Sequence, residues 1–288
     1  MKRRSFLLSL LPLSGSLSGC AFMRNLVAQP APPPPPALAD DATLEQVVFC
    51  LNENTEKLKS WWTTNAKISI RGQPLSAPAT IAVEAPRNFR LIAKSPMGKE
   101  ADFGSNQEQF WFWTKQNNEE RRIFTARHDR FTGRMRQLPI PFQPDWIMDV
   151  MGVIPIDIGE VRMERNPPGS HMVTLFSDGQ SPQGYLVRKA TLVDLQNGVI
   201  RERGLYNAHN QLVAKAVLSG YVLHAQKDAP SLDAAKVKVP TQIEIHWPEA
   251  QLDMTVHLGG VEVNPGRIPG QPWTLQEIEG YSVWDLSR

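Results

Sequence analysis

Cysteine is scarce in this sequence of 288 residues, which contains Cys20 and Cys50 and no others. Two cysteines cannot build a disulfide framework, and Cys50 has no partner in the chain if Cys20 is modified. Because Cys50 falls among apolar residues of an expected helix, we interpret it as a small buried side chain rather than a reactive thiol. The fold is therefore expected to form without disulfide bonds.

An excess of either charge is also missing. The chain has 31 Lys and Arg residues against 29 Asp and Glu residues, a formal net charge of +2. Lys2, Arg3 and Arg4 lie in a segment that we expect to be removed, which leaves 28 basic and 29 acidic residues and a net charge of −1. Such a balance gives no support for binding to a phosphate backbone, so we expect no nucleic-acid partner.

The sequence lacks the motifs that usually carry catalysis or metal binding. It contains no nucleophile elbow, no phosphate-cradling glycine loop and no histidines at HxH or HExxH spacing. His128 stands in a loop-like stretch, while His246 and His257 lie on separate expected strands. We therefore expect no catalytic residues, no metal and no cofactor, and a hydrolase is the least favoured of the functions that we consider.

Beyond the N-terminus, no run of about twenty apolar residues occurs that could span a membrane. Residues 1–19 have the layout of a secretory signal, with a basic start, an apolar run over 6–13 and small residues before Cys20. Leu17-Ser18-Gly19-Cys20 resembles the lipobox of bacterial lipoproteins, in which the cysteine takes a diacylglyceryl group and becomes the new N-terminus.

The lipobox implies that Cys20 is acylated and that membrane lipid holds the protein through this anchor. The two residues after Cys20 include no Asp, which favours the outer membrane. An ordinary signal peptide followed by a free cysteine is the alternative. Arg3-Arg4 also leaves both the Sec and the twin-arginine export routes open.

Proline, by contrast, is abundant after the expected cleavage site. Residues 20–42 contain Pro30 and the run 32–36. Successive prolines favour an extended polyproline II conformation, which spans about 3 Å per residue. We interpret this segment as a tether between the lipid and a folded domain.

Three strands and two turns are predicted for the stretch PRNFRLIAKSPMGKEADFGSNQEQFWFW. Phe89 and Leu91 alternate with more polar residues, as expected of a strand with one covered face. Residues 95–98 have Pro and Gly at positions that suit a reverse turn, which places Met97 at its tip. Four consecutive aromatic residues then fill 110–113 and need apolar partners on both faces of their strand.

Further strands follow at short intervals, including one uninterrupted strand over 212–223. Their spacing, without βαβ alternation or internal repeats, predicts antiparallel neighbours. A helix capped by Asp40 or Asp41 and ending near Trp61 precedes them, and its apolar positions recur at spacings of three and four. The pattern predicts one mainly β domain over 43–263 that curls into a barrel or half-barrel.

The strand pattern breaks between 138 and 155, where several prolines surround a short segment that can be helical. Trp146, Ile147 and Val150 give residues 145–151 an apolar face. A helix of fewer than ten residues is not stable alone, so it must lie against something apolar. We predict that it is a lid.

Residues 264–288 form a tail in which prolines and glycines interrupt regular structure. Apolar residues near its end should allow it to pack back on the domain. They are Trp273, Leu275, Ile278, Tyr281, Val283 and Trp284.

Two of these stretches resemble the Lol family of lipoprotein carriers and receptors (LolA/LolB-like). PRNFRLIAKSPMGKEADF is similar to the family's P-x-x-[FY]-R-L strand, its N/S-P-[LM]-G turn and the strand that follows. Residues 138–153 resemble its P-I-P segment and short Trp-containing helix. The resemblance implies a half-open antiparallel barrel of about eleven strands, with an N-terminal helix and short lid helices over an apolar cavity for acyl chains. It implies no catalysis.

Two features of the sequence indicate which branch of the Lol family this chain resembles more. The carriers have an Arg immediately before the Pro of this strand, which holds their lid shut, whereas this chain has Ala85. That departure, together with the lipobox, favours the outer-membrane receptor branch, whose members are themselves lipoproteins. The aromatic strand 110–113 is closer to the pattern of the carriers, so a divergent branch with another ligand stays open.

The resemblance also implies a ligand cavity and a transfer loop. We assign Met97, at the turn tip, to contact with membrane or with incoming acyl chains. We assign the cavity to residues of two strands and of the short helix: Phe89, Leu91, Phe110, Phe112, Trp146, Ile147 and Val150.

The resulting hypothesis is a monomeric envelope lipoprotein that binds acyl chains and acts in lipoprotein sorting or insertion. Its expected partners are membrane lipid, the acyl chains of lipoproteins or other lipids, and a periplasmic lipoprotein carrier. Its expected location is the periplasmic face of the outer membrane. The alternative is a non-enzymatic structural or interaction lipoprotein of the envelope, with the same fold but with an interior filled by side chains.

Overall fold

The computed structural model describes residues 35–115, 119–130, 143–167, 169–181, 185–226, 236–270 and 272–287. The expected signal, the predicted lipidation site Cys20 and residues 20–34 of the tether lie outside these residues, as does the first part of the stretch 138–155. The chain divides into two units, Met1–Pro35 and Pro36–Arg288.

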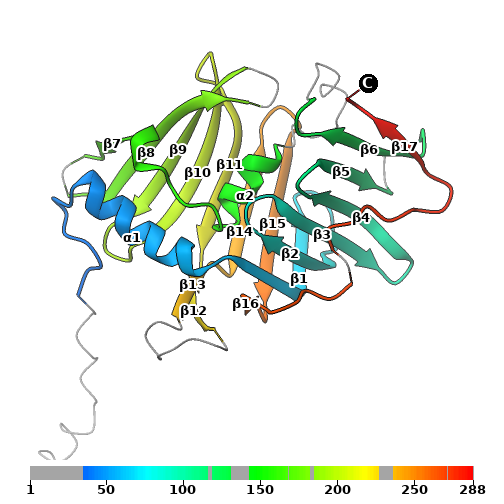
Figure 1. Ribbon diagram of the computed structural model, residues 1–288, viewed down its shortest axis with the longest axis horizontal. Coiled ribbons are helices and arrows are strands. Elements are labelled where there is room, and N and C mark those ends of the chain that lie inside the picture. Colours follow the sequence, from blue (N-terminus) through cyan, green and yellow to red (C-terminus); the bar gives the residue numbers. More distant parts are fainter. Residues whose placement is uncertain are drawn as a thin grey trace, which may run out of the picture. The chain divides into compact units, whose positions relative to one another are not determined.

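Hairpins between successive strands, together with the pairings of β1 with β15, β11 with β14 and β17 with β6, join fifteen of the described strands into one sheet (Figure 1). Its order is β17-β6-β5-β4-β3-β2-β1-β15-β14-β11-β10-β9-β8-β7, with β16 beside β1. Neighbours are antiparallel except for β17 and β6, which are parallel. Because β17 and β7 stand at opposite ends of this order, the sheet is open, and the predicted mainly β, half-open antiparallel fold is confirmed.

The strands of the sheet include the predicted ones and two short additions near the C-terminus. They are β1 (Ser60–Ile70), β2 (Ala77–Glu84), β3 (Asn88–Ser95), β4 (Gly98–Ser105), β5 (Gln109–Thr114), β6 (Arg122–Arg127), β7 (Val161–Arg165), β8 (Met172–Gln180), β9 (Leu186–Asp194), β10 (Val199–Asn207), β11 (Leu212–Ser219), β14 (Gln242–Trp247), β15 (Leu252–Gly259), β16 (Glu262–Val263) and β17 (Ser282–Asp285). A short 3-10 helix, η3 (Ile158–Glu160), precedes β7.

The N-terminal helix, α1 (Leu44–Lys57), starts later and ends earlier than predicted. Thr43 caps it in place of Asp40 or Asp41, because the Thr43 Oγ1 accepts from the Gln46 N–H and the Gln46 side chain accepts from the Thr43 N–H. The predicted end near Trp61 is also wrong, since Trp61 is fully buried within β1. A bulky aromatic side chain suits the pleated surface of a sheet.

The strand predicted over 212–223 is broken in two. β11 stays in the main sheet, whereas β12 (Val222–Ala225) pairs with β13 (Lys236–Val239) in a separate two-stranded sheet. The break falls at Gly220, whose φ of +65° is left-handed and where a Cβ would lie 2.1 Å from the Thr241 Oγ1. The apolar pattern continues through this position, so periodicity alone does not reveal the break.

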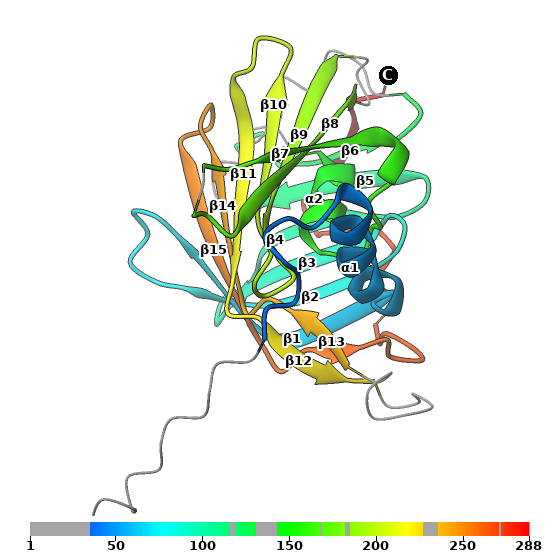
Figure 2. The same ribbon diagram turned by 90° about the vertical axis from the view of Figure 1, so that its left-hand side faces the viewer.

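The helices α1 and α2 (Pro144–Val150) lie on the same side of the sheet, which curls round them (Figure 2). We call this side, which carries Ile81, Leu91 and Ile243, the concave face. α1 packs against apolar residues of β8 and β9 in one buried cluster. α2 packs in a second, larger cluster with residues of β1, β2, β3, β5 and β14. Two apolar cores therefore share the concave face.

The C-terminal tail returns to the sheet and adds β17 beside β6, with Val283 opposite Ile123. Val283 is 58% exposed, so it contributes less to packing than expected. Leu286, just beyond the strand, is fully buried and joins the cluster around α2. Trp273, Leu275, Ile278 and Tyr281 are partly buried. The fully buried Leu286 is thus a residue that the sequence pattern did not single out.

Candidate functional site

The seven predicted cavity residues come together on the concave face. Phe89 and Leu91 alternate along β3, and Phe110 and Phe112 alternate along β5, so each pair points to the same side. These four side chains belong to the same buried cluster as Trp146, Ile147 and Val150 of α2, and none of the seven is more than 4% exposed. The alternation of residues along β3 and β5 and the helical spacing in α2 therefore place all seven side chains on one surface.

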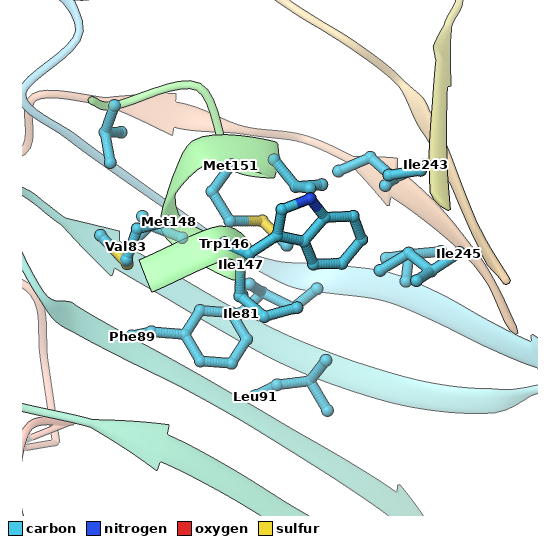
Figure 3. Close-up of a cluster of buried hydrophobic side chains, with 14 of the residues drawn as sticks. Ile81, Val83, Phe89, Leu91, Trp146, Ile147, Met148, Met151, Ile243 and Ile245 are labelled. Atoms are coloured by element: carbon cyan, nitrogen blue, oxygen red, sulfur yellow. The ribbon is translucent and has the colours of Figure 1, made fainter. Parts of the chain in front are cut away.

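The helix α2 occupies the place where an open cavity was expected. Six of its seven residues are buried, and the N–H of the Trp61 indole donates to the Met151 carbonyl oxygen just after the helix at 3.1 Å. Figure 3 shows the Trp146 ring between Ile243 and Ile245 of β14 on one side and residues of β2 and β3 on the other. In this structure the predicted cavity residues pack against one another and against α2.

The indole N–H of Trp146 is buried and has no hydrogen-bond acceptor within the part of the chain that the structure describes. A buried donor without a partner costs about 1–3 kcal/mol, which offsets part of what burial of this large ring contributes.

One side of α2 is polar, a feature that the sequence analysis missed. Asp149, at 8% exposure, faces β9, and its Oδ2 accepts from the Lys189 Nζ at 2.6 Å. At the start of the helix, Asp145 lies 3.4 Å from the Arg87 guanidinium in the β2–β3 turn. These ion pairs fix α2 to two distant parts of the sheet. A charged residue inside a short apolar helix was the available signal.

Met97 lies at the tip of the β3–β4 turn, as predicted, and is 82% exposed. Its backbone N–H donates to the Ser95 Oγ at 3.0 Å, and Gly98 adopts a φ of +112° that favours glycine. Ser95 also donates to Glu100 at 2.6 Å, which lowers the pKa of that carboxyl. The turn is thus well ordered by local hydrogen bonds, while the Met97 side chain gains no burial from the fold.

An open groove of about 540 Å³ runs along the outer side of α1. We call it the α1 groove; Val48, Phe49, Ile156 and Ile158 provide its apolar lining, and Glu45 and Glu56 are also among its lining residues. Phe49 is 68% exposed. The spacing of apolar residues in this helix does not include Phe49, so the groove was not predicted from the sequence.

Other candidates from the sequence have ordinary structural roles. Cys50 is partly buried rather than buried as predicted, and this burial raises the pKa of its thiol, as expected for an unreactive cysteine. Arg127 and Asp129 form an exposed ion pair at 2.9 Å. Among the described residues, no three His, Cys, Asp or Glu side chains are grouped as metal ligands would be. No helix within the described ranges is long and apolar enough to cross a membrane.

No protein-family model and no curated protein matches this sequence. Three solved structures are similar to the chain at low identity. A Vibrio parahaemolyticus domain described in connection with outer-membrane lipoprotein sorting is 9% identical, with coverage of 79% of this chain and 96% of that chain and a TM-score of 0.47. A DUF1329 family protein from Desulfovibrio piger is 10% identical (78% and 93%, TM-score 0.47), and a LolA superfamily protein from Nitrosomonas europaea is 9% identical (81% and 99%, TM-score 0.46). Similarity at this level indicates nothing about the site.

Proposed function

We propose that this chain is a lipid-anchored envelope lipoprotein that holds acyl chains on the concave face of its sheet after α2 has moved aside. The observation that carries the proposal is α2 itself. A helix of seven residues cannot be stable alone, yet it covers an apolar surface built from several strands. Displacing it would expose a continuous apolar surface of the kind that binds flexible chains.

Two further features support this role. The segment around Met97 and the stretch containing α2 are the ones that resemble Lol carriers and receptors, and Met97 is an exposed apolar tip suited to contact with membrane. The lipobox at Cys20 would hold the domain at the periplasmic face of the outer membrane. We assign the protein to the receptor side of lipoprotein sorting, as a monomer that takes acyl chains from a periplasmic carrier and performs no catalysis.

The proposal is tested by the lipid that the protein retains. The full chain with Cys20→Ser is collected from the soluble fraction without detergent, extracted with organic solvent and analysed by mass spectrometry. We expect acyl-chain lipids at close to one equivalent. Trp146→Glu, which places a carboxylate on the acyl-binding surface, should remove most of this lipid while lowering the melting temperature only moderately.

Phe49→Glu is the matched control, because it places the same charge on the exposed side of α1. Its lipid content should equal that of the parent. If Trp146→Glu retains the same lipid, or if it fails to fold at all, α2 is an ordinary core helix and the acyl-binding role is wrong.

A second function, that of an interaction protein, is favoured by a different observation. The concave face is filled by α2, while the α1 groove is open and apolar with two glutamates among its lining residues. An amphipathic, basic segment of a partner protein matches that surface. In this case Phe49→Glu would abolish partner binding in a pull-down from envelope extract, whereas Trp146→Glu would affect only stability, and no lipid would co-purify.

A further inference from the structure

A buried guanidinium next to α2 lacks sufficient hydrogen-bond partners. Arg203 lies on β10, is 7% exposed, and donates from Nη1 to the Oγ1 of its cross-strand neighbour Thr191 at 3.3 Å. A guanidinium has five N–H donors, and within the described residues Thr191 is its hydrogen-bond partner. Burial lowers the pKa of Arg203, a direction that reflects the cost of keeping this charge out of water.

The neighbouring carboxylates are already engaged by other groups. The negative charge of Asp149 favours the charged form of Arg203. The Asp149 Oδ2, however, already accepts a hydrogen bond from the Lys189 Nζ at 2.6 Å. Asp194 is bound by Arg201 at 2.6 Å and by the Asn197 side chain at 2.7 Å. Neither carboxylate forms an ion pair with Arg203 within the described part of the chain. The surroundings of Arg203 therefore retain an excess of positive charge.

This guanidinium faces a small, partly open cavity. The cavity has a volume of about 40 Å³ and lies between α1, the end of α2 and β10. Its apolar lining includes Leu58 and Met151 of the cluster around α2. Its polar lining comprises Asn54, Thr55, Arg203, Tyr221, Lys238 and the carboxylate of Asp149, which belongs to α2 and is bound by Lys189. A water needs at least 10–15 Å³ of such space, so the cavity accepts a group of a few heavy atoms and not a chain.

We propose that Arg203 binds the anionic head group of an amphiphile, a carboxylate or a phosphate, whose acyl chain lies on the concave face. The inference rests on the proposed function, because only displacement of α2 makes room for the chain. A guanidinium recognises the oxygens of both groups through paired N–H donors.

The geometry explains why the head group and the chain would be recognised together. Leu58, which is not part of α2, lines the cavity and also belongs to the apolar cluster that α2 fills. A chain that takes the place of α2 beside Leu58 would leave its head group next to Arg203. An amphiphile with a neutral head group would gain the apolar contacts but nothing from the charge. The site therefore selects anionic from neutral amphiphiles of equal chain length.

The test compares three probes with the same ten-carbon chain: decanoate, decyl phosphate and 1-decanol. Each is titrated by calorimetry into the soluble full chain with Cys20→Ser at pH 8, after bound lipid has been removed. We expect at least one anionic probe to bind about ten times more tightly than decanol. The tighter of the two anions identifies the head group as carboxylate or phosphate. Inorganic phosphate and acetate alone should compete weakly.

Two variants separate a specific contact from general charge. Arg203→Gln should reduce the preference for the anionic probe to less than threefold while leaving the affinity for decanol unchanged. Arg188→Gln, which removes an exposed charge on neighbouring β9, should leave the preference intact. If Arg203→Gln fails to fold, the three affinities measured on the parent protein still test whether the site prefers anionic amphiphiles. If the parent protein binds all three probes with equal affinity, Arg203 has a purely structural role, and the proposed binding of acyl chains is retained. If the parent protein binds none of the probes, the proposed function itself is wrong.

Discussion

At the scale of single residues, the buried carboxylate of Asp102 shows how this sheet holds charge on the face opposite α2. Asp102 is fully buried, and its oxygens accept from Arg90 at 2.7 Å, Lys99 at 2.8 Å and the Trp111 indole at 3.1 Å. Arg90 also donates to the carbonyl oxygen of Pro272 in the tail at 3.0 Å. Breaking a buried ion pair is costly, and here the tail supplies backbone carbonyl oxygens as further acceptors for the Arg90 guanidinium.

Met97 is the residue for which exposure and function are most directly linked. Because its side chain is 82% exposed and contacts no core, Met97→Glu should change the free energy of unfolding by less than about 0.5 kcal/mol. Transfer of acyl-chain ligand from the protein to vesicles should nevertheless fall several-fold, since burial of one such side chain in lipid is worth about 1.5–3 kcal/mol. Leu75→Glu, at a position 83% exposed in the β1–β2 connection, is the control and should leave transfer unchanged. Unaltered transfer by Met97→Glu would make Met97 an ordinary exposed side chain.

His128 predicts a pH dependence of stability. It is partly buried, its Nε2 lies 2.9 Å from the Asn106 carbonyl oxygen, and burial lowers its pKa. The unfolded chain therefore takes up the proton first, near the ordinary pKa of about 6.5. The stabilising contribution of neutral His128 is complete above that pH and is lost as the pH falls below it.

Urea unfolding at pH 7 and at pH 5.5 measures this effect. The native protein should lose stability over this interval, and His128→Gln should lose less. His209→Gln, at an exposed position, should follow the native protein. If the native protein and His128→Gln lose the same free energy of unfolding between pH 7 and pH 5.5, protonation of His128 does not affect stability.

At the scale of elements, the capping box of α1 is worth a measurable amount. Thr43→Ala removes the side-chain acceptor of the Gln46 N–H and should lower the free energy of unfolding by about 1 kcal/mol. Asp41→Ala tests the cap that the sequence favoured and should cost less than about 0.5 kcal/mol, because Asp41 is exposed and lies outside the helix. Denaturant titration of both variants distinguishes the two. A larger loss for Asp41→Ala would reverse the assignment.

The elements also show what could be predicted from sequence and what could not. Strands β2 to β6 were found because alternation and turn residues are local signals, and the same signals placed Phe89, Leu91, Phe110 and Phe112 on one face. The break at Gly220 depends on Thr241, twenty-one positions away, and so is not local. Whether α2 fills or covers the concave face depends on side-chain volumes contributed by many strands, and the Asp149–Lys189 pair depends on how β9 lies against the helix. Neither has a signature within a short window of sequence.

At the scale of the whole described unit, an open sheet of fifteen strands must protect its two edges. β7 stands at one end of the order and β17 at the other, next to β6. Unpaired strand edges are sites for association with other chains. By pairing in parallel with β6, β17 covers the backbone of a longer strand, and Arg122 stacks on Trp284 with its guanidinium 3.8 Å from the ring centre. The tail is thus part of the folded unit.

The anchor that keeps β17 in place is Leu286, and its removal gives the last prediction. Leu286 is fully buried in the cluster around α2, and its N–H donates to the Thr125 carbonyl oxygen at 2.8 Å. Leu286→Ala leaves a cavity and should lower the free energy of unfolding by about 2–5 kcal/mol. Val283→Ala in the same tail should cost less than about 1 kcal/mol, because Val283 is 58% exposed.

Loss of the anchor would also free β17 and expose the edge of β6. Leu286→Ala should therefore associate in a concentration-dependent manner when measured by light scattering, whereas Val283→Ala should stay monomeric. Equal stability and equal association of the two variants would mean that the tail is held by β17 pairing alone and that Leu286 is not its anchor.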